Sequence, residues 1–564
     1  MNRNTESHFS LVPHVDISRS RFDRSASLKT SFNAGDVVPF FLDEVLPGDT
    51  FSVDTSKVVR MQTLLTPMMD NVYLDTYYFF VPNRLVWDHW KEFCGENTES
   101  AWIPQTEYSM PQITSPANTG WNVGTLADYF GIPTGVAGLS VSALPFRAYA
   151  LIMNEWFRDQ NLQDPLVVPT DDSTVAGVNT GTTVTDVAKG GKPFIAAKYH
   201  DYFTSSLPAP QKHEDVVIPV ATGGQINVVG NGKGLALTNG SVAGTLSPSD
   251  NYGALNFFKD PYGSAVGSSA SSGSQNVGFK QQVLGVPTVE QLGSDLSNSG
   301  LIGVQSAIAQ AATINQLRLA FQIQKFYEQQ ARGGSRYTEV VRSFFGVTSP
   351  DARLQRPEYL GGNRVPINVN QIVQQSGTDS SGTPQGTVVG QSLTTDKHSD
   401  FTKSFTEHGF IIGVMVARYD HTYQQGLNRL WSRKDKFDYY WPVFANIGEQ
   451  AIKNKEIFAQ GNDKDNEVFG YQEAWAEYRY KPNMVTGEMR SAYAQSLDVW
   501  HLADDYKQLP TLSDAWIKED KSNIDRVLAV TSSVSNQFFA DIFVKNYVTR
   551  PMPMYSVPGL IDHH

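Results

Sequence analysis

Two early segments of the chain carry apolar side chains in patterns that predict β-strands. In residues 51–61 apolar side chains recur at alternate positions with polar ones between them, which predicts a half-buried strand. In residues 72–81 both sets of alternate positions are apolar or aromatic. A strand of this kind is covered on both faces, so the second segment is expected to lie between two layers of the fold.

The last third of the chain contains two further predicted strands. Residues 410–417 are an almost unbroken apolar run, and residues 538–549 are rich in aromatic and β-branched side chains. We interpret both as fully buried strands. Strong strands therefore lie near both ends of the chain, with helices and long loops between them, which indicates a mainly β protein.

Three helices are predicted between these strands. A short one spans residues 86–93. A second follows Ser142 as its N-cap and carries an apolar stripe over residues 144–156. A third spans about residues 308–331 and is stopped by the glycine pair that follows it.

Composition divides the 564 residues into four parts. Residues 1–35 are polar and mildly basic, and we expect an extended N-terminal arm with little core of its own. Residues 36–215 form the first part of the fold with helical insertions, and residues 301–564 form the remainder with helical and loop insertions. Residues 216–300 are dominated by small and polar side chains. An excursion this long inside a compact domain is usually a functional insertion or disordered. Its scattered valines and isoleucines favour short strands, so we interpret it as an inserted surface projection.

The spacing of these elements favours one β architecture over others. No internal repeat of roughly 20–50 residues is visible, which disfavours solenoids and propellers. Short strands joined by loops of very unequal length fit a jelly roll, in which two packed antiparallel sheets carry their insertions at the ends.

Charge and aromatic content suggest extensive burial and interfaces. Charged residues make up 18% of the chain, against roughly 25% in typical soluble domains. Aromatic residues reach 12%, and these side chains are enriched at interface cores. The net charge of −12 argues against a chain that coats nucleic acid along its whole length, although local basic faces are compatible with it.

The single cysteine and the short apolar runs indicate the cellular compartment in which the protein is made. Cys94 has no partner for an intramolecular disulfide. The first 30 residues carry no apolar signal-peptide core, and residues 410–417 are far shorter than the roughly 20 residues that a membrane helix needs. We expect a soluble protein made in a reducing cytoplasm.

The sequence contains no specific catalytic motif, so we expect a protein without enzymatic activity or cofactor. No phosphate-binding loop, His-Glu-x-x-His pair, paired-cysteine zinc spacing or Gly-x-Ser-x-Gly elbow is present. Asp463, Asp465 and Glu467 place three carboxylates at alternate positions, which is a weak calcium-site pattern. The glycine of an EF-hand loop is replaced by Val468, and a solvated acidic loop is the favoured interpretation.

One segment, residues 429–441, combines cations with aromatic rings. The candidate nucleic-acid-binding residues are Arg429, Trp431, Arg433, Lys434 and Lys436, followed by Phe437, Tyr439, Tyr440 and Trp441. Cations that hold phosphates and rings that stack on bases are the groups that single-stranded nucleic acid needs. In the alternative interpretation the rings belong to the core or an interface and the cations pair with neighbouring carboxylates.

Motifs along almost the whole chain, in preserved order, resemble those of a known family. They occupy residues 25–32, 46–50, 61–67, 77–83, 143–149, 154–160, 199–203, 331–334, 348–353, 429–442 and 550–553. Together they resemble the major capsid protein of the gokushoviruses, a branch of the microviruses, which are small icosahedral single-stranded DNA phages.

The resemblance implies a single eight-stranded antiparallel jelly roll and a homo-oligomer of sixty copies in a T=1 icosahedral shell. It also implies packaged single-stranded DNA on the inner face, minor virion proteins as further partners, and assembly in the bacterial host cytoplasm. One long insertion projects outward in this family, and residues 216–300 are the natural candidate for contact with a host receptor.

A glycan-binding or glycan-cleaving β-sandwich is the competing interpretation, because Trp-rich jelly rolls often bind sugars. Glycoside hydrolysis needs two carboxylates that flank the scissile bond, and the sequence neither shows nor excludes such a pair. A secreted adhesin conflicts with the missing signal peptide.

Overall fold

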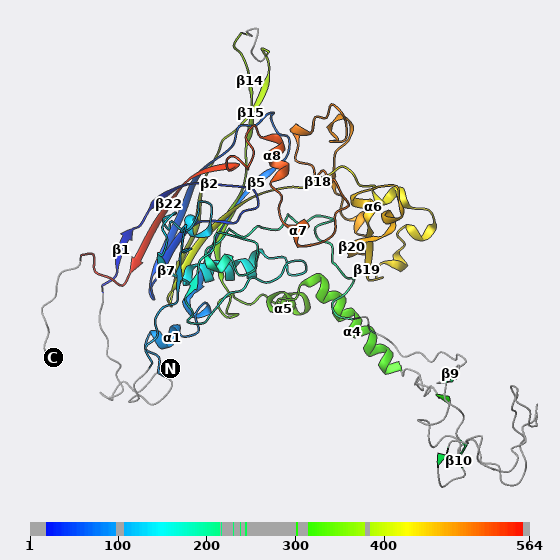
Figure 1. The fold of residues 1–564 in the computed structure, drawn as a ribbon, viewed down its shortest axis with the longest axis horizontal. Coiled ribbons are helices and arrows are strands. Elements are labelled where there is room, and N and C mark those ends of the chain that lie inside the picture. The colour runs from blue at the N-terminus through cyan, green and yellow to red at the C-terminus, as the bar shows by residue number, and fades with distance from the viewer. Residues whose placement is uncertain are drawn as a thin grey trace, which may run out of the picture. The chain divides into compact units, whose positions relative to one another are not determined.

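The structure is a computed structural model that describes residues 18–97, 106–214, 216, 314–377 and 384–555, together with four two-residue strands between residues 229 and 302. The chain divides into two units, of which the first comprises Met1–Glu214 and Lys325–His564 and the second comprises Asp215–Gln324. The first unit contains all the large sheets (Figure 1). Within the described residues no helix is both long and apolar enough to cross a membrane.

The first sheet of this unit is antiparallel and follows the order β1-β22-β4-β16, with β2 also paired to β22. Its strands are β1 (Ser20–Asp23), β2 (Ala26–Phe32), β4 (Thr50–Met61), β16 (Thr394–Ser404) and β22 (Phe538–Arg550). β1 and β2 pair with consecutive parts of β22, so they extend one edge of the sheet. The predicted arm therefore contributes strands from Ser20 onward, while residues 1–17 lie outside the described residues.

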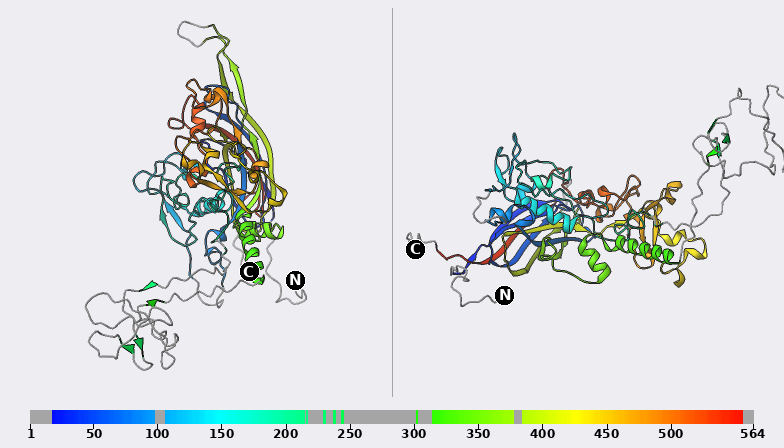
Figure 2. Two further views of the ribbon diagram at one scale, coloured as in Figure 1. Left: turned by 90° about the vertical axis from the view of Figure 1, so that its right-hand side faces the viewer. Right: turned by 90° about the horizontal axis from the view of Figure 1, so that it is seen from below.

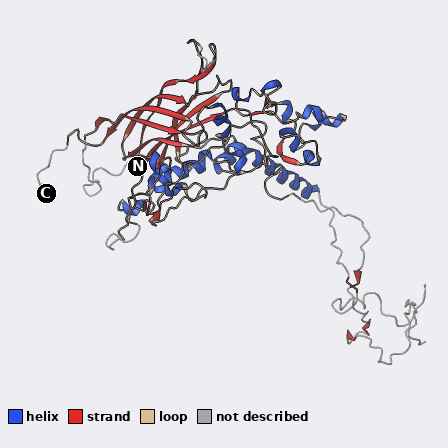
Figure 3. Ribbon diagram, turned by 45° about the horizontal axis from the view of Figure 1, so that its top comes forward, coloured by secondary structure: helices blue, strands red, loops and turns tan. Residues whose placement is uncertain are grey.

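The second sheet follows the order β13-β5-β17-β3 and is also antiparallel. Its strands are β3 (Val38–Val45), β5 (Val72–Pro82), β13 (Glu358–Pro366) and β17 (Gly409–Tyr419). β17 is buried along almost all of its length, which confirms the prediction for residues 410–417. Both sheets are visible as neighbouring layers of strands in Figure 3.

The inward faces of the two sheets share one hydrophobic core. Phe32 and Phe538 stack in the first sheet with ring centroids 5.4 Å apart. Phe80 of the second sheet meets Phe405, just after β16, at 4.5 Å. Alternate side chains of β4 point into this core, so the predicted half-buried strand is confirmed.

A second core covers the outer face of the β13-β5-β17-β3 sheet. β5 contributes Tyr78 and Phe80 to the first core and Phe79 and Val81 to this second one. The cover comes mainly from residues 106–196, which include α3 (Leu144–Ile152) and lie against one side of the strands in Figure 2. The prediction that residues 72–81 lie between two layers is therefore confirmed.

A third, smaller core lies beyond the end of β17. It gathers side chains from residues 197–203, 423, 452–476 and 516–517. The elements here include a hairpin of β19 (Glu449–Lys453) and β20 (Val468–Glu473), with α6 (Asn454–Ile457) between the two strands.

The remaining elements of the first unit are short, apart from two helices and one hairpin. They are α1 (Trp90–Phe93), β6 (Gln112–Thr114), α2 (Leu126–Tyr129), β7 (Ser140–Ser142), β8 (Val175–Ala176), α4 (Ile314–Gly333, which begins in the second unit), α5 (Tyr337–Phe345), β14 (Val369–Val373), β15 (Val388–Ser392), β18 (Thr422–Tyr423), β21 (Asn483–Met484), α7 (Asp514–Ile517) and α8 (Ser522–Val527). β14 and β15 pair as an antiparallel hairpin. In the second unit, β9 (Val229–Gly230) pairs with β12 (Leu301–Ile302), and β10 (Leu237–Thr238) pairs with β11 (Ala243–Gly244).

The helix predictions are confirmed in part. The first helix is limited to α1. α3 begins at Leu144 without a side-chain cap and continues as a π turn to Phe157, although the Ser142 hydroxyl accepts a 3.4 Å hydrogen bond from the Leu144 amide. α4 ends at the predicted glycine pair, where Gly334 has a left-handed φ of 93°. The expected start of that helix, at residues 308–313, lies outside the described residues.

The prediction of a fully buried strand at residues 538–549 is wrong. β22 alternates between buried and exposed positions, with Phe539 39% and Phe543 44% exposed. Asp541 and Lys545 share the outward face of the strand with these two rings, and this charged alternation is the signal that the aromatic content obscured.

Candidate nucleic-acid interface

The 429–441 segment lies on the third core and is folded into short 3₁₀ turns. One turn spans Arg429–Ser432 and another spans Lys436–Asp438. The Asp435 carboxylate accepts a hydrogen bond from the Phe437 amide at 2.7 Å. The Asp438 carboxylate accepts bonds from the Lys434 amide at 2.6 Å and the Asp435 amide at 3.1 Å, and these backbone bonds lower the pKa of Asp438. Hydrogen bonds from backbone amides to the Asp435 and Asp438 carboxylates therefore hold the backbone of this segment. A β-strand would instead be held by hydrogen bonds to a neighbouring strand.

The two arginines of the segment are engaged by carboxylates from the same core. Arg429 lies 3.6 Å from Glu456 and 3.6 Å from Glu477. Arg433 lies 3.3 Å from Glu477 and also donates to the Tyr478 hydroxyl. Burial raises the pKa of Glu456, and the Arg429 charge opposes that rise. Arg429 and Arg433 thus hold the segment in place, as the alternative interpretation predicted for the cations.

The two lysines are placed differently. Lys434 and Lys436 are both exposed, and neither forms an ion pair with a carboxylate in the part of the chain that the structure describes. The Lys436 ammonium lies 5.0 Å from the centroid of the Phe437 ring. The lysines therefore leave two positive charges available to a phosphate.

The aromatic rings of the segment are not part of the core. Trp431 is 73% exposed and Trp441 is 50% exposed. Phe437, Tyr439 and Tyr440 are also exposed, although Tyr440 meets the edge of Trp475 at 5.8 Å. The Trp441 indole donates a 2.7 Å hydrogen bond to the Lys436 carbonyl, which fixes the ring beside the lysine. This arrangement offers ring faces and cations together, as a single-strand site requires.

Several residues of this site were not predicted from the sequence. Glu456, Glu477 and Tyr478 supply the arginine contacts from positions more than 20 residues away. Lys453 and Lys455 line the same cavity of about 200 Å³ as Arg429 and Arg433. In the sequence, the only signal for these residues is the spacing of Lys453 and Lys455 two positions apart, which could have suggested additional cations for the site.

The structure does not assemble the candidate calcium site. Asp463, Asp465 and Glu467 lie in and beside a short 3₁₀ turn, Asp463–Asn466. The Asp465 carboxylate accepts backbone bonds from Gln460 at 2.9 Å and Gly461 at 2.7 Å. No group of three His, Cys, Asp or Glu side chains suited to a metal ion occurs among the described residues. The geometry here is that of a loop closed by one of its own carboxylates.

Comparison with known proteins gives matches along the full length of the chain. Residues 10–560 match the family described as capsid protein (F protein). The chain is 41% identical over 556 residues to the capsid protein VP1 of Spiroplasma virus 4. The aligned region covers 98% of this chain and 97% of that protein. It is 42% identical over 590 residues to the capsid protein VP1 of Chlamydia phage 1, with 98% of each chain covered. The chain therefore belongs to the phage capsid protein (F protein) family, in its gokushovirus branch.

Proposed function

We propose that eight strands of the first unit form a jelly roll. The β2-β22-β4-β16 sheet and the β13-β5-β17-β3 sheet share one core. Along the chain, each connection between these eight strands crosses from one sheet to the other, except the one from β5 to β13. Such interleaving is the property of two nested Greek keys. The two very long connections, β5 to β13 and β17 to β22, carry the second and third cores and the second unit.

We propose that the chain is the shell subunit of a T=1 icosahedral particle with sixty copies. The observation that carries this proposal is the match to phage capsid proteins from residue 10 to residue 560. Uncovered rings, such as Phe539 and Phe543 on the first sheet, support it because a shell subunit buries several interfaces against its neighbours. The particle is the virion, assembled in the cytoplasm of a bacterial host.

Expression of the full chain followed by negative-stain imaging tests the shell proposal. We expect closed particles of uniform diameter. A stable monomer that binds or cleaves a glycan would contradict the proposal and favour the alternative β-sandwich function.

We propose that the 429–441 segment contacts the packaged single-stranded DNA. Trp431, Lys434 and Lys436 are the contact residues, because their rings and charges are exposed and unengaged by carboxylates. Arg429 and Arg433 are positioning residues that anchor the segment to Glu456 and Glu477. Residues 463–467 have no comparable support as a calcium site, because no group of three His, Cys, Asp or Glu side chains suited to a metal ion occurs among the described residues.

We propose that residues 216–300 form the projection that contacts a host receptor. Their low content of core-forming side chains is compatible with a surface role. Deletion of residues 223–274 is expected to leave particle assembly intact and to reduce adsorption to host cells, measured by the fraction of particles that sediment with the cells. Loss of assembly would show instead that the segment is a contact within the shell.

A further inference from the structure

The β14–β15 hairpin projects from the two sheets of the first unit (Figure 1 and Figure 2). Its base is anchored to the body of that unit. The Ile367 amide donates a 2.7 Å hydrogen bond to the Val72 carbonyl, and Gly390 pairs with Leu64. A Cβ on Gly390 would lie 2.7 Å from the Thr66 carbonyl oxygen, so this close approach needs a glycine. The base therefore fixes the direction in which the hairpin projects.

The outer half of the hairpin carries apolar side chains on both faces. Ile372 lies opposite Val389, and Val373 lies opposite Val388. Because successive side chains of a strand point to opposite faces, the two pairs lie on different sides of the hairpin. Ile372 is 42% exposed and Val373 is 40% exposed. An isolated two-stranded hairpin is only marginally stable in water, so a further strand along its edge would stabilise this one.

The outer edge of β14 is open to such a strand. The Gln374 amide donates a 2.9 Å hydrogen bond to the Thr387 carbonyl, so the even-numbered residues of β14 direct their backbone groups toward β15. The odd-numbered residues, Val369, Gln371 and Val373, direct theirs outward. Among the described residues, β15 is the only strand that pairs with β14. The outward backbone groups therefore have no strand partner within this part of the chain.

The composition of the hairpin restricts what pairs with this edge. Neither β14 nor β15 contains a charged residue or a proline, although natural proteins commonly use such residues to prevent an open edge from pairing. The lack of cations disfavours nucleic acid as the occupant, because phosphates are held by cations. The edge is thus suited to an uncharged strand of a protein.

The edge is complementary to the same edge of a second copy of this chain. In an antiparallel pair of β14 strands, Gln371 lies opposite Gln371 of the second copy, and Val369 lies opposite Val373. This register uses all three outward residues of each strand. A slide by two residues would leave one outward residue of each copy unpaired, because Ile367 is already bonded to Val72. The valine pairs at both ends would also cover the exposed side chain of Val373.

We propose that β14 pairs with β14 of a second copy across a two-fold axis of the particle. The proposal rests on the proposed function, because it names one contact between neighbouring shell subunits. Such an isologous contact needs a two-fold axis, which an icosahedral shell contains. A strand of five residues buries far less than the roughly 1,200–2,000 Å² of a stable protein pair. The contact therefore forms in the particle, together with other contacts, and not in an isolated dimer.

Disulfide formation in assembled particles tests the proposal. Gln371→Cys is introduced in a Cys94→Ser background, because Cys94 is exposed. Opposite residues of an antiparallel pair have Cα atoms about 5.5 Å apart, which is within the range of a disulfide. After oxidation we expect most subunits to migrate as linked pairs on a non-reducing gel.

The matched control is Gln375→Cys in the same background, which changes another exposed glutamine of the hairpin. In the proposed register the Cα atoms of the two Gln375 residues lie about 27 Å apart along the paired strands. This distance is far beyond the reach of a disulfide, so we expect about tenfold less linked product than from Gln371→Cys.

A second variant measures how far the contact supports assembly. Val373→Lys places an ammonium beside Val369 of the second copy, and we expect it to lower the yield of closed particles severalfold. Val373 is 40% exposed, so the denaturation midpoint of the unassembled chain should stay unchanged. Gln375→Lys adds the same charge beyond the paired strand and should leave the particle yield unchanged.

Three results would overturn the proposal. Equal linkage of Gln371→Cys and Gln375→Cys in closed particles would exclude this contact and leave the shell proposal standing. Normal particle yield of Val373→Lys with reduced adsorption to host cells would assign the open edge to a host protein. Failure of the unchanged chain to form closed particles, which imaging decides independently, would exclude the shell proposal and this contact with it.

Discussion

β5 and the 429–441 segment are both rich in aromatic side chains, but the fold treats them in opposite ways. The rings of β5 are covered on both faces by the same chain, through the sandwich core and the α3 layer. The rings of the 429–441 segment remain largely exposed. Aromatic content alone therefore does not determine burial, because the local structure decides whether the chain covers its own rings or leaves them exposed.

The backbone explains the difference. β5 is hydrogen bonded to β13 and β17 on its two edges, so its alternate side chains enter two separate layers. The 429–441 segment has caps that close turns in place of sheet partners. The charged side chains of the two regions differ in the same respect. His421, just after β17, is buried among carboxylates, whereas Lys434 and Lys436 are exposed.

The largest expected effect is on the free energy of unfolding, which should depend on a ring of β5 much more than on a ring of the 429–441 segment. Phe80→Ala should lower the free energy of unfolding of the unassembled chain by about 3–5 kcal/mol, because a buried ring is lost from a packed core. Trp431→Ala should lower it by less than about 0.5 kcal/mol, as expected for an exposed site. Denaturant titration measures both, and equal losses would abolish the distinction.

The second effect concerns the buried charge at His421. Its ring nitrogens lie 3.0 Å from Asp504 and 3.0 Å from Glu519. Burial alone would lower the pKa of His421, but the two carboxylates outweigh it and raise the pKa to about 10. The folded state therefore holds a proton that the unfolded state releases near its ordinary pKa of 6.5.

The contribution of His421 to stability is thus fully present below pH 6.5 and is lost as the pH rises toward about 10. We expect the free energy of unfolding to fall by about 2–3 kcal/mol between pH 7 and pH 9. His421→Gln should be less stable at pH 7 and should show a flatter dependence over this window. An identical slope in the variant would contradict the assignment.

Substitution of Lys434 and Lys436 is expected to have the smallest effect on the free energy of unfolding and the greatest effect on the amount of packaged DNA. The double variant Lys434→Glu and Lys436→Glu should unfold within about 0.5 kcal/mol of the unchanged chain, because both side chains are exposed. Its particles should contain less DNA, measured by the ratio of absorbance at 260 and 280 nm. Lys91→Glu with Lys507→Glu makes the same charge change at two other exposed lysines. Equal DNA content in both double variants would exclude the segment as a specific contact.

The sequence predicted those parts of the fold that depend on local periodicity. β4, β5 and β17 follow from the alternation or continuity of apolar side chains. β22 was assigned to the correct residues but to the wrong environment, because Asp541 and Lys545 were outweighed by the aromatic content. Lys434 and Lys436 are exposed, and their contact with nucleic acid stays a prediction. The pairing of Arg429 and Arg433 with carboxylates followed only from the alternative interpretation.

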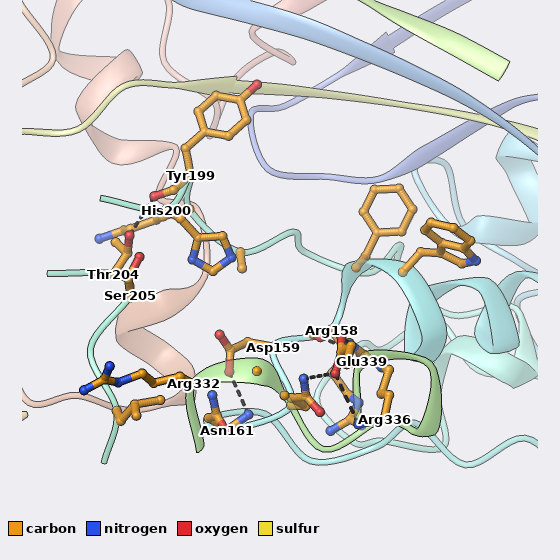
Figure 4. Close-up of a pocket in the computed structure, with 18 of the residues that line it drawn as sticks. Arg158, Asp159, Asn161, Tyr199, His200, Thr204, Ser205, Arg332, Arg336 and Glu339 are labelled. Carbon is orange, nitrogen blue, oxygen red and sulfur yellow. Dashed lines mark hydrogen bonds and ion pairs between the residues drawn. The ribbon is translucent and has the colours of Figure 1, made fainter. Parts of the chain in front are cut away.

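Contacts between distant parts of the chain were not predictable. Glu456 and Glu477 reach the two arginines only because the β19–β20 hairpin and the turns after it return to the same core. A cavity of about 810 Å³ in the first unit (Figure 4) is lined by segments that span residues 77 to 418, and no local pattern connects them. Such sites depend on how the long connections pack, which periodicity does not encode.

We propose that this chain closes into a shell around single-stranded DNA. Charge-detection mass spectrometry of purified particles, before and after release of the DNA, measures the number of copies and the mass of the packaged strand directly. We expect sixty copies per particle and a single-stranded DNA of uniform mass. Particles with a different or variable number of copies, or closed shells that never contain DNA, would contradict it.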